Sequence, residues 1–162
     1  MIRGIHHVAI NTPDLDRLLA FYRDVVGFEV VQSTRFDWKD SPEIDTIVGI
    51  RGSASKVVML RAANAYIEMF EYQQPAARNT ERLAPSDHGY THICLDVVDV
   101  AAEYERLSRN GMTFHAPPTS VEDGKIRTVY GRDPDGNILE LQELSPSHDM
   151  AVENIRGFQA AR

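Results

Sequence analysis

An internal repeat constrains this sequence more than any other feature. Segment 4–11, GIHHVAIN, recurs as segment 89–96, GYTHICLD, and in both a Gly stands three residues before a His that is followed by an apolar residue. A segment with helical spacing that ends at a Gly comes next in each copy. The chain therefore reads as a duplication.

The second half of each copy repeats as well. Segment 65–72, AYIEMFEY, aligns with segment 137–144, NILELQEL, and this alignment places Glu68 over Glu140. Each copy then offers one His on its first strand and one Glu on its last. Two imidazoles and two carboxylates from matching places in two repeats are what a metal site on a pseudo-twofold axis requires. The predicted ligands are His7, Glu68, His92 and Glu140.

Alternating and helical patterns predict the same order of elements in both halves. Each half reads as β-α-β-β-β, a unit too small to bury its own sheet. We therefore expect an α+β fold in which two such modules form one curved, eight-stranded mixed sheet around the metal site. The predicted strands cover 5–11, 28–36, 56–61, 66–72, 90–97, 112–116, 125–131 and 137–144. Helices are predicted from the Thr12 cap to Gly27, from Pro42 to Gly49 or Gly52, and from the Asp99 cap to Asn110.

The same patterns divide the chain into four parts. The first module covers 1–74, a linker with two prolines covers 75–88, the second module covers 89–145, and a weakly apolar tail covers 146–162. With a hydrophobic share of 43%, a chain of 162 residues can bury a core without disulfides.

Net charge and cysteine content indicate which kinds of partner and which compartment to expect. A net charge of −7 argues against a nucleic-acid surface and against a polybasic membrane patch. Cys94 is the only cysteine, which favours a reducing compartment. Because the N-terminal segment lacks the apolar region of a signal peptide and no stretch is long enough to span a bilayer, we expect a cytoplasmic protein.

Strand alternation predicts what surrounds the ligands. Glu68 shares a face with three aromatic residues of its strand, and the long segment after residue 28 adds Phe36 and Trp38, although Trp38 could equally cap the core or an interface. Cys94 lies two positions after His92 and either faces the site or is a small buried residue. The predicted substrate pocket comprises Asn11, Phe36, Trp38, Tyr66, Phe70, Tyr72, Cys94 and Asp96.

The type of ligand indicates the type of site. Imidazole and carboxylate ligands suit Zn²⁺, Ni²⁺, Co²⁺, Fe²⁺ or Mn²⁺, and the absence of thiolate argues against a closed structural zinc site. Four ligands in an octahedral sphere leave positions for water or a substrate. We therefore expect one divalent ion in a catalytic site.

Three segments resemble those of the vicinal oxygen chelate superfamily, which includes glyoxalase I, methylmalonyl-CoA epimerase, extradiol dioxygenases and bleomycin-binding proteins. They are HHVAI followed by LLAFYRDVVGF, then GYTHICLDV, then RDPDGNILEL, and together they span about residues 4–144. In this superfamily the ligands come from the first and last strands of each module. The resemblance thus implies the same four ligands as the repeat.

The ligand set is similar to that of bacterial glyoxalase I. That resemblance implies a lyase or isomerase in which the metal holds the oxygens of an enediolate while a carboxylate moves a proton between adjacent carbons. Glu140 and Glu68 are the candidate bases. Glyoxalase I usually has an Arg where this chain has Asn11 and an Asn where it has Tyr72, which argues against glutathione binding without deciding it, and the aromatic face of the Glu68 strand indicates a less polar substrate. We expect a small oxo, hydroxy or thioester substrate.

Two other functions of the superfamily stay open. An Fe²⁺ extradiol dioxygenase would need two His and one Glu, which His7, His92 and Glu140 could supply. A metal-free binding or resistance protein would need none of the ligands. The small size and the resemblance also predict a homodimer.

Overall fold

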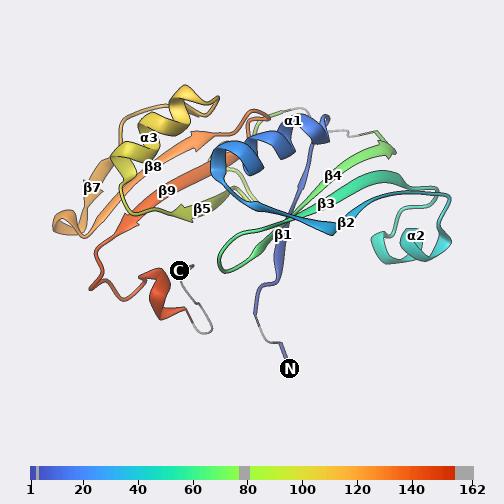
Figure 1. The fold of residues 1–162 in the computed structure, drawn as a ribbon, viewed down its shortest axis with the longest axis horizontal. Coiled ribbons are helices and arrows are strands. Elements are labelled where there is room, and N and C mark those ends of the chain that lie inside the picture. Colours follow the sequence, from blue (N-terminus) through green and yellow to red (C-terminus); the bar gives the residue numbers. More distant parts are fainter. Residues whose placement is uncertain (3, 77–80, 156–162) are drawn as a thin grey trace. The chain divides into compact units, whose positions relative to one another are not determined.

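The computed structural model describes residues 1–2, 4–76 and 81–155, and the chain divides into two compact units, Met1–Thr80 and Glu81–Arg162. Residues 77–80 of the predicted linker and 156–162 of the predicted tail lie outside the described residues. Each unit combines a mixed sheet with helices (Figure 1), which confirms the α+β class and the two βαβββ modules. The finer division at residues 74, 88 and 145 stays a prediction.

The first unit places its first and last strands side by side. Its sheet has the order β1-β4-β3-β2, in which β1 runs parallel to β4 and the other neighbours are antiparallel. The elements are β1 (His7–Asn11), α1 (Leu15–Ala20), the π-helical turn η1 (Phe21–Val26), β2 (Glu29–Lys39), α2 (Pro42–Val48), β3 (Ala54–Arg61) and β4 (Tyr66–Gln74).

The second unit repeats this topology. Its sheet has the order β5-β9-β8-β6, again with the first strand parallel to the last. The elements are β5 (His92–Asp96), α3 (Val100–Arg109), β6 (Thr113–Phe114), β7 (Thr119–Val121), the 3-10 turn η2 (Glu122–Gly124), β8 (Ile126–Arg132), β9 (Ile138–Leu144) and the 3-10 turn η3 (Val152–Asn154).

The second sheet has one strand more than predicted. β7 pairs antiparallel with β8 through a short turn in which Glu122, Asp123 and Gly124 all have positive φ. Among the described residues the two sheets therefore contain four and five strands, one more in total than the predicted eight. A strand of three residues is too short to give an alternating pattern, which is why the sequence does not reveal it.

The helix ends follow capping rules, with one correction. Asp99 caps α3 as predicted, Ser41 caps α2, and both side chains accept hydrogen bonds from the first turn. The cap of α1 is Asp14, which accepts from the backbone N–H of Arg17, and not Thr12. The Thr12 hydroxyl instead contacts the backbone of Asp14.

One face of each sheet is covered by a helix, and the opposite face carries the candidate ligands of the β4 and β9 strands. α1 packs on β4 and α3 on β9 (Figure 1). Ile67 and Met69 of β4 are buried, as are Leu139 and Leu141 of β9. Glu68 and Glu140 lie between these residues along the chain, so alternation turns them to the opposite face.

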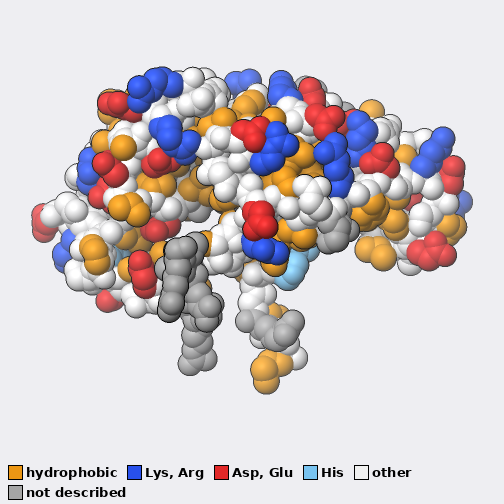
Figure 2. Space-filling view, viewed as in Figure 1, with side chains coloured by type: hydrophobic (Ala, Val, Ile, Leu, Met, Phe, Trp, Pro, Cys, Tyr) orange, Lys and Arg blue, Asp and Glu red, His pale blue; other side chains and the backbone are white. Residues whose placement is uncertain are grey.

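The outer surface of the helices is polar. Figure 2 shows acidic and basic side chains interspersed over α1 and α3. In the part of the chain that the structure describes, no helix is long and apolar enough to cross a membrane.

A second carboxylate on β4 ties the sheet to the helix. Glu71 accepts a hydrogen bond from the backbone N–H of Leu15, the first residue of α1, at 2.9 Å. It also forms an ion pair with Lys56, whose Nζ lies 2.8 Å from Oε1. These contacts lower the pKa of Glu71, with the Lys56 contact as the larger cause and the Leu15 amide as the next.

The second unit repeats this tie. Glu143 of β9 accepts from the backbone N–H of Val100, the first residue of α3, at 3.0 Å, and from Arg127 Nη1 at 3.2 Å. Arg127 pairs with Glu143 across β8 and β9 as Lys56 pairs with Glu71 across β3 and β4. The duplication therefore extends to these structural ion pairs.

Candidate active site

The first unit brings two predicted ligands together. His7 opens β1, and Glu68 lies on the neighbouring parallel strand β4, opposite Ala9. His7 Nε2 lies 3.3 Å from Glu68 Oε2.

The second unit brings the other two ligands together in the same way. His92 opens β5, and Glu140 lies on β9 opposite Cys94. His92 Nε2 lies 3.3 Å from Glu140 Oε2, the same distance as in the first unit. We refer to His7 with Glu68 and to His92 with Glu140 as the two His–Glu pairs.

The two pairs fit the donor set of a divalent ion. Bonds of about 2.1 Å to one ion at angles between about 90° and 110° place neighbouring donor atoms about 3.0–3.4 Å apart. The observed separation of 3.3 Å falls in this range. Within the described residues of either unit, no group of three or more His, Cys, Asp or Glu could hold an ion. Each unit thus offers two donors, half of the predicted set.

The residue before each candidate His contacts the Nδ1 atom of that His. His7 Nδ1 lies 2.9 Å from His6 Nδ1, and His92 Nδ1 lies 3.0 Å from Thr91 Oγ1. In the tautomer that leaves Nε2 free to bind a metal, Nδ1–H is the donor in both contacts. His6 also stacks on the ring of Tyr66, with centroids 5.0 Å apart.

Glu140 is held more firmly than its counterpart. The hydroxyl of Thr128 donates to Glu140 Oε1 at 2.6 Å, and Glu140 is only 8% exposed. Cys94 lies beside it, and burial, followed by the charge of Glu140, raises the pKa of the Cys94 thiol to about 12, although part of the residue is open to solvent. At neutral pH this thiol stays protonated and is not a nucleophile.

Four aromatic residues of the first unit form a connected cluster, which we name the aromatic shelf. Trp38 packs edge-to-face against Phe70 and Tyr72 at centroid distances of 5.8 and 5.6 Å, and Phe36 lies 6.2 Å from it. Phe70 and Tyr72 share the Glu68 face of β4 by alternation, and burial, followed by the charge of Glu68, raises the pKa of Tyr72.

The members of the shelf differ in exposure. Trp38 is 7% exposed and its indole N–H donates to Ser53 Oγ at 2.9 Å, so it anchors the shelf in the core. Phe36 is 51% exposed and offers its ring to solvent. Tyr66 stands apart from this cluster, and Asn11, which pairs with Phe70 across the strands, is exposed.

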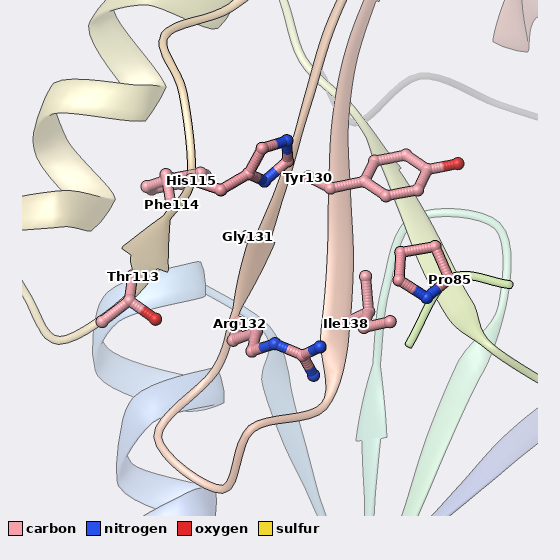
Figure 3. Close-up of a pocket in the computed structure, with 8 residues that line it drawn as sticks. All are labelled: Pro85, Thr113, Phe114, His115, Tyr130, Gly131, Arg132 and Ile138. Atoms are coloured by element: carbon pink, nitrogen blue, oxygen red, sulfur yellow. The ribbon is translucent and has the colours of Figure 1, made fainter. Parts of the chain in front are cut away.

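A cavity of about 430 Å³ lies in the second unit (Figure 3). Tyr130 connects it with the second His–Glu pair, since its ring is 4.9 Å from that of His92 and its hydroxyl is 3.5 Å from His92 Nε2. Burial, then the charge of Glu140, raises the pKa of Tyr130, which keeps the hydroxyl protonated. The lining residues are Pro85, Thr113, Phe114, His115, Tyr130, Gly131, Arg132 and Ile138.

Arg132 lines this cavity, but its guanidinium is bound to backbone carbonyls. The guanidinium of Arg132 donates to the carbonyls of Gly136 at 2.6 Å and Leu83 at 2.8 Å. Asp96, predicted to face the substrate, is not among the lining residues, and burial followed by the charge of Glu153 raises its pKa.

Comparison with known proteins identifies the family. The model of the Glyoxalase/Bleomycin resistance protein/Dioxygenase superfamily matches residues 4–141. The chain belongs to this superfamily. A glyoxalase family protein from Bacillus cereus has the same fold, with a TM-score of 0.79 at 20% identity, over 89% of this chain and 95% of that chain.

Several relatives from the glyoxalase superfamily are named enzymes. A 2-epi-5-epi-valiolone epimerase from Actinomyces sp is 35% identical over 87% of this chain and 79% of that protein. An ethylmalonyl-CoA/methylmalonyl-CoA epimerase from Cereibacter sphaeroides is 27% identical over 89% and 100%. A lactoylglutathione lyase from Salmonella typhimurium is 25% identical over 85% and 90%. The predicted superfamily is therefore confirmed, and its named relatives here are epimerases and a lyase.

Three residues that contact the two His–Glu pairs were not predicted from the sequence. Thr128 and Tyr130 lie at alternate positions of β8 beside Glu140, and His6 contacts His7. The sequence does contain a signal for Thr128 and Tyr130, because they stand two residues apart on the strand that precedes Glu140 and therefore share one face of it. His6 matches Thr91 in the repeat, and both residues can hydrogen-bond.

Proposed function

We propose that the protein is a divalent-metal-dependent isomerase, epimerase or lyase that moves a proton next to the carbonyl group of a small oxo, hydroxy or thioester substrate. The observation that carries this proposal is the His–Glu pair, which occurs at the same 3.3 Å separation in both units. The names of the relatives support the same class of reaction, since they include two epimerases and a lyase.

In the proposed site a pair from each unit contributes to one ion, held by His7, Glu68, His92 and Glu140. A divalent ion of the Zn²⁺, Ni²⁺, Co²⁺, Fe²⁺ or Mn²⁺ kind stabilises the negative charge that develops on a substrate oxygen when the neighbouring carbon loses a proton. Whether the pairs meet within one chain or across the proposed homodimer is a separate question. Mixing His7→Ala chains with His92→Ala chains answers it, because only a site shared between chains can be restored in the mixture.

Side chains of the protein carry out the proton transfer and bind the substrate oxygen. A Glu carboxylate takes the proton from the substrate carbon, and the electron pair of the broken C–H bond moves toward the carbonyl oxygen. The Tyr130 hydroxyl donates a hydrogen bond to a substrate oxygen, for which its contact with His92 places it well. Return of the proton to the adjacent carbon gives an isomer, and return to the opposite face of the same carbon gives an epimer.

The surroundings favour a compact substrate over a glutathione conjugate. The aromatic shelf offers apolar rings on the Glu68 side, where Asn11 stands in place of a cation for a glutathione carboxylate. The cavity of about 430 Å³ beside Tyr130 has room for a small molecule.

Metal content tests the site directly. We expect about one divalent ion per chain by mass spectrometry of the untagged protein, and none after His7→Ala or His92→Ala. If both His–Glu pairs were only hydrogen-bonded, the protein would hold no ion even after reconstitution. That result would favour a metal-free binding protein.

Hydrogen exchange tests the reaction. The metal-loaded protein should exchange the hydrogen next to the carbonyl of 2-epi-5-epi-valiolone or methylmalonyl-CoA with D₂O. Glu68→Gln and Glu140→Gln should each remove this exchange, one by loss of the base and the other by loss of a ligand. Retention in both variants would eliminate the proposed bases, and Fe²⁺-dependent O₂ uptake with catechols would favour a dioxygenase.

A further inference from the structure

Polar side chains follow one another across the face of the second sheet that carries Glu140, and the outermost of them have no role in the proposed proton transfer. Tyr130 pairs with Glu140 across β8 and β9, so the two side chains lie on one face of the sheet. Thr113 of β6 pairs with Arg132, which follows Tyr130 by two residues, and Thr113 therefore shares this face. His115 comes two residues after Thr113, just beyond the end of β6.

His115 and Tyr130 line the same cavity of about 430 Å³. Figure 3 shows the imidazole of His115 extending from the end of β6 toward Tyr130. Because β8 lies between β9 and β6, the two outer strands are about 10 Å apart, twice the usual spacing of neighbouring strands. A six-membered ring with one oxygen on each side can therefore reach from the pair of His92 and Glu140 to His115, with a polar contact at either end.

Thr113 and His115 are available to a ligand. Both residues are exposed, and among the described residues neither side chain has a hydrogen-bond or ion-pair partner. A neutral imidazole offers one donor and one acceptor, and a hydroxyl offers one donor and two lone pairs. A hydroxyl group of a ligand, which also donates and accepts, matches both side chains.

The remaining lining residues favour a neutral ligand. Among the described residues that line the cavity none is an Asp or a Glu, so a cationic group would find no carboxylate there. Arg132 would be the partner of an anionic group, but its Nη1 and Nη2 already donate to the carbonyls of Gly136 and Leu83 at 2.6 and 2.8 Å. Pro85 and Ile138 offer apolar surface to the body of a ring. These walls fit a neutral ring that carries hydroxyl groups.

We propose that His115 is a specificity-determining residue, which binds a hydroxyl group on the far side of a neutral, hydroxylated cyclic ketone, with Thr113 as a second hydrogen-bonding partner. This inference rests on the proposed function and narrows its substrate to one class. The carbonyl oxygen of the ring lies near His92 and Tyr130, and the hydroxyl group across the ring lies near His115.

Two simple ketones test this assignment, because cyclohexanone and 4-hydroxycyclohexanone differ only in a hydroxyl group across the ring from the carbonyl. Exchange of the hydrogens next to the carbonyl with D₂O is followed for the metal-loaded whole chain at about pH 8, where free imidazole is neutral. The wild-type protein should exchange 4-hydroxycyclohexanone with a kcat/KM about tenfold higher than that of cyclohexanone, the size of effect expected of one added hydrogen bond.

Substitutions at His115 test whether the imidazole causes this preference. His115→Leu keeps the approximate size of the side chain, removes both nitrogens and should bring the two ketones to the same kcat/KM. His115→Asn keeps a donor and an acceptor and should retain part of the preference. The matched control is His88→Leu, which removes an exposed histidine that does not line the cavity and should keep the full preference.

The possible results distinguish this inference from the function on which it rests. Equal kcat/KM values in the wild-type protein, absence of exchange with 4-hydroxycyclohexanone, or a preference that persists in His115→Leu would overturn the inference. Exchange of 2-epi-5-epi-valiolone or methylmalonyl-CoA would in that case still support the proposed function. Absence of exchange with every probe would overturn the proposed function and this inference with it. Thermal unfolding of His115→Leu at the wild-type temperature shows that a lost preference is not a lost fold.

Discussion

Glu68 and Glu71 stand three residues apart on β4, and this odd spacing separates their roles. Residues at odd spacing on a strand face opposite sides of the sheet. Glu71 therefore reaches the start of α1 and Lys56, whereas Glu68 faces His7. The same division holds for Glu143 and Glu140. In each pair of acidic residues one member binds the adjoining helix, and the other faces the His of the candidate site.

Glu71→Gln should destabilise the protein in a pH-dependent manner. The folded-state pKa of Glu71 lies below its ordinary value of 4.5, so its stabilising contribution is present above that pH and is lost as the pH falls through the folded-state pKa. We expect a loss of about 1–3 kcal/mol in the free energy of unfolding at neutral pH, and a smaller difference from wild type at about pH 3. Urea unfolding at both values measures this.

The matched control is Glu105→Gln. Among the described residues, the Glu105 side chain pairs only with Arg109 on α3, and the two side chains are 70% and 72% exposed. Its substitution should change stability by less than about 0.5 kcal/mol. A Glu71→Gln difference that stayed constant from neutral to acid pH would contradict an ionic cause.

Tyr130→Phe should lower the rate of proton exchange without affecting metal binding. The hydroxyl lies 3.5 Å from His92 Nε2, the nitrogen that we propose as a metal ligand, and a donor lost from such a position costs about 100-fold in rate. Co²⁺ affinity should stay at the wild-type value because the Tyr is not a ligand. Tyr104→Phe, which removes a hydroxyl from a ring packed on Phe114, is the control, and an equal effect of both substitutions would contradict the role of Tyr130.

At the scale of elements, the sequence predicts most helices and strands because their patterns are long. α1 and α3 carry apolar stripes, and the caps Ser41 and Asp99 stand next to clear helical spacing. The cap of α1 is ambiguous in sequence because Thr12 and Asp14 are both good caps, and only geometry decides between them. The π-helical turn η1 leaves no mark in the apolar spacing either.

The contact between β6 and β8 depends on the absence of a side chain at Gly131. A Cβ at this position would lie 2.6 Å from atoms of Met112 and Phe114. We expect Gly131→Ala to destabilise the protein by about 1–3 kcal/mol in chemical unfolding, because a packed site must shift to admit it. Combining it with Phe114→Leu should cost less than the sum of the two single substitutions. Strict additivity would contradict a steric cause.

At the scale of the whole molecule, the duplication explains both what the sequence predicts of the site and what it misses. The closeness of His7 to Glu68 and of His92 to Glu140 was predictable because each residue has a counterpart in the other copy. Tyr130 and Thr128 have Met59 and Val57 as counterparts, so the repeat gives no reason to select them. The features that make the two halves of the proposed site differ are those that a search for repetition leaves out.

One shared ion should also couple the stability of the two units. At about a hundred times its Kd, Co²⁺ should stabilise the native protein by about 2.7 kcal/mol, which for a chain of this size raises the midpoint of thermal unfolding by about 5–10 °C. Because a single ion would need both His–Glu pairs, His7→Ala and His92→Ala should each abolish the whole shift. If each pair held an ion of its own, either variant would keep about half of it, and the proposal of one site built from two repeats would be wrong.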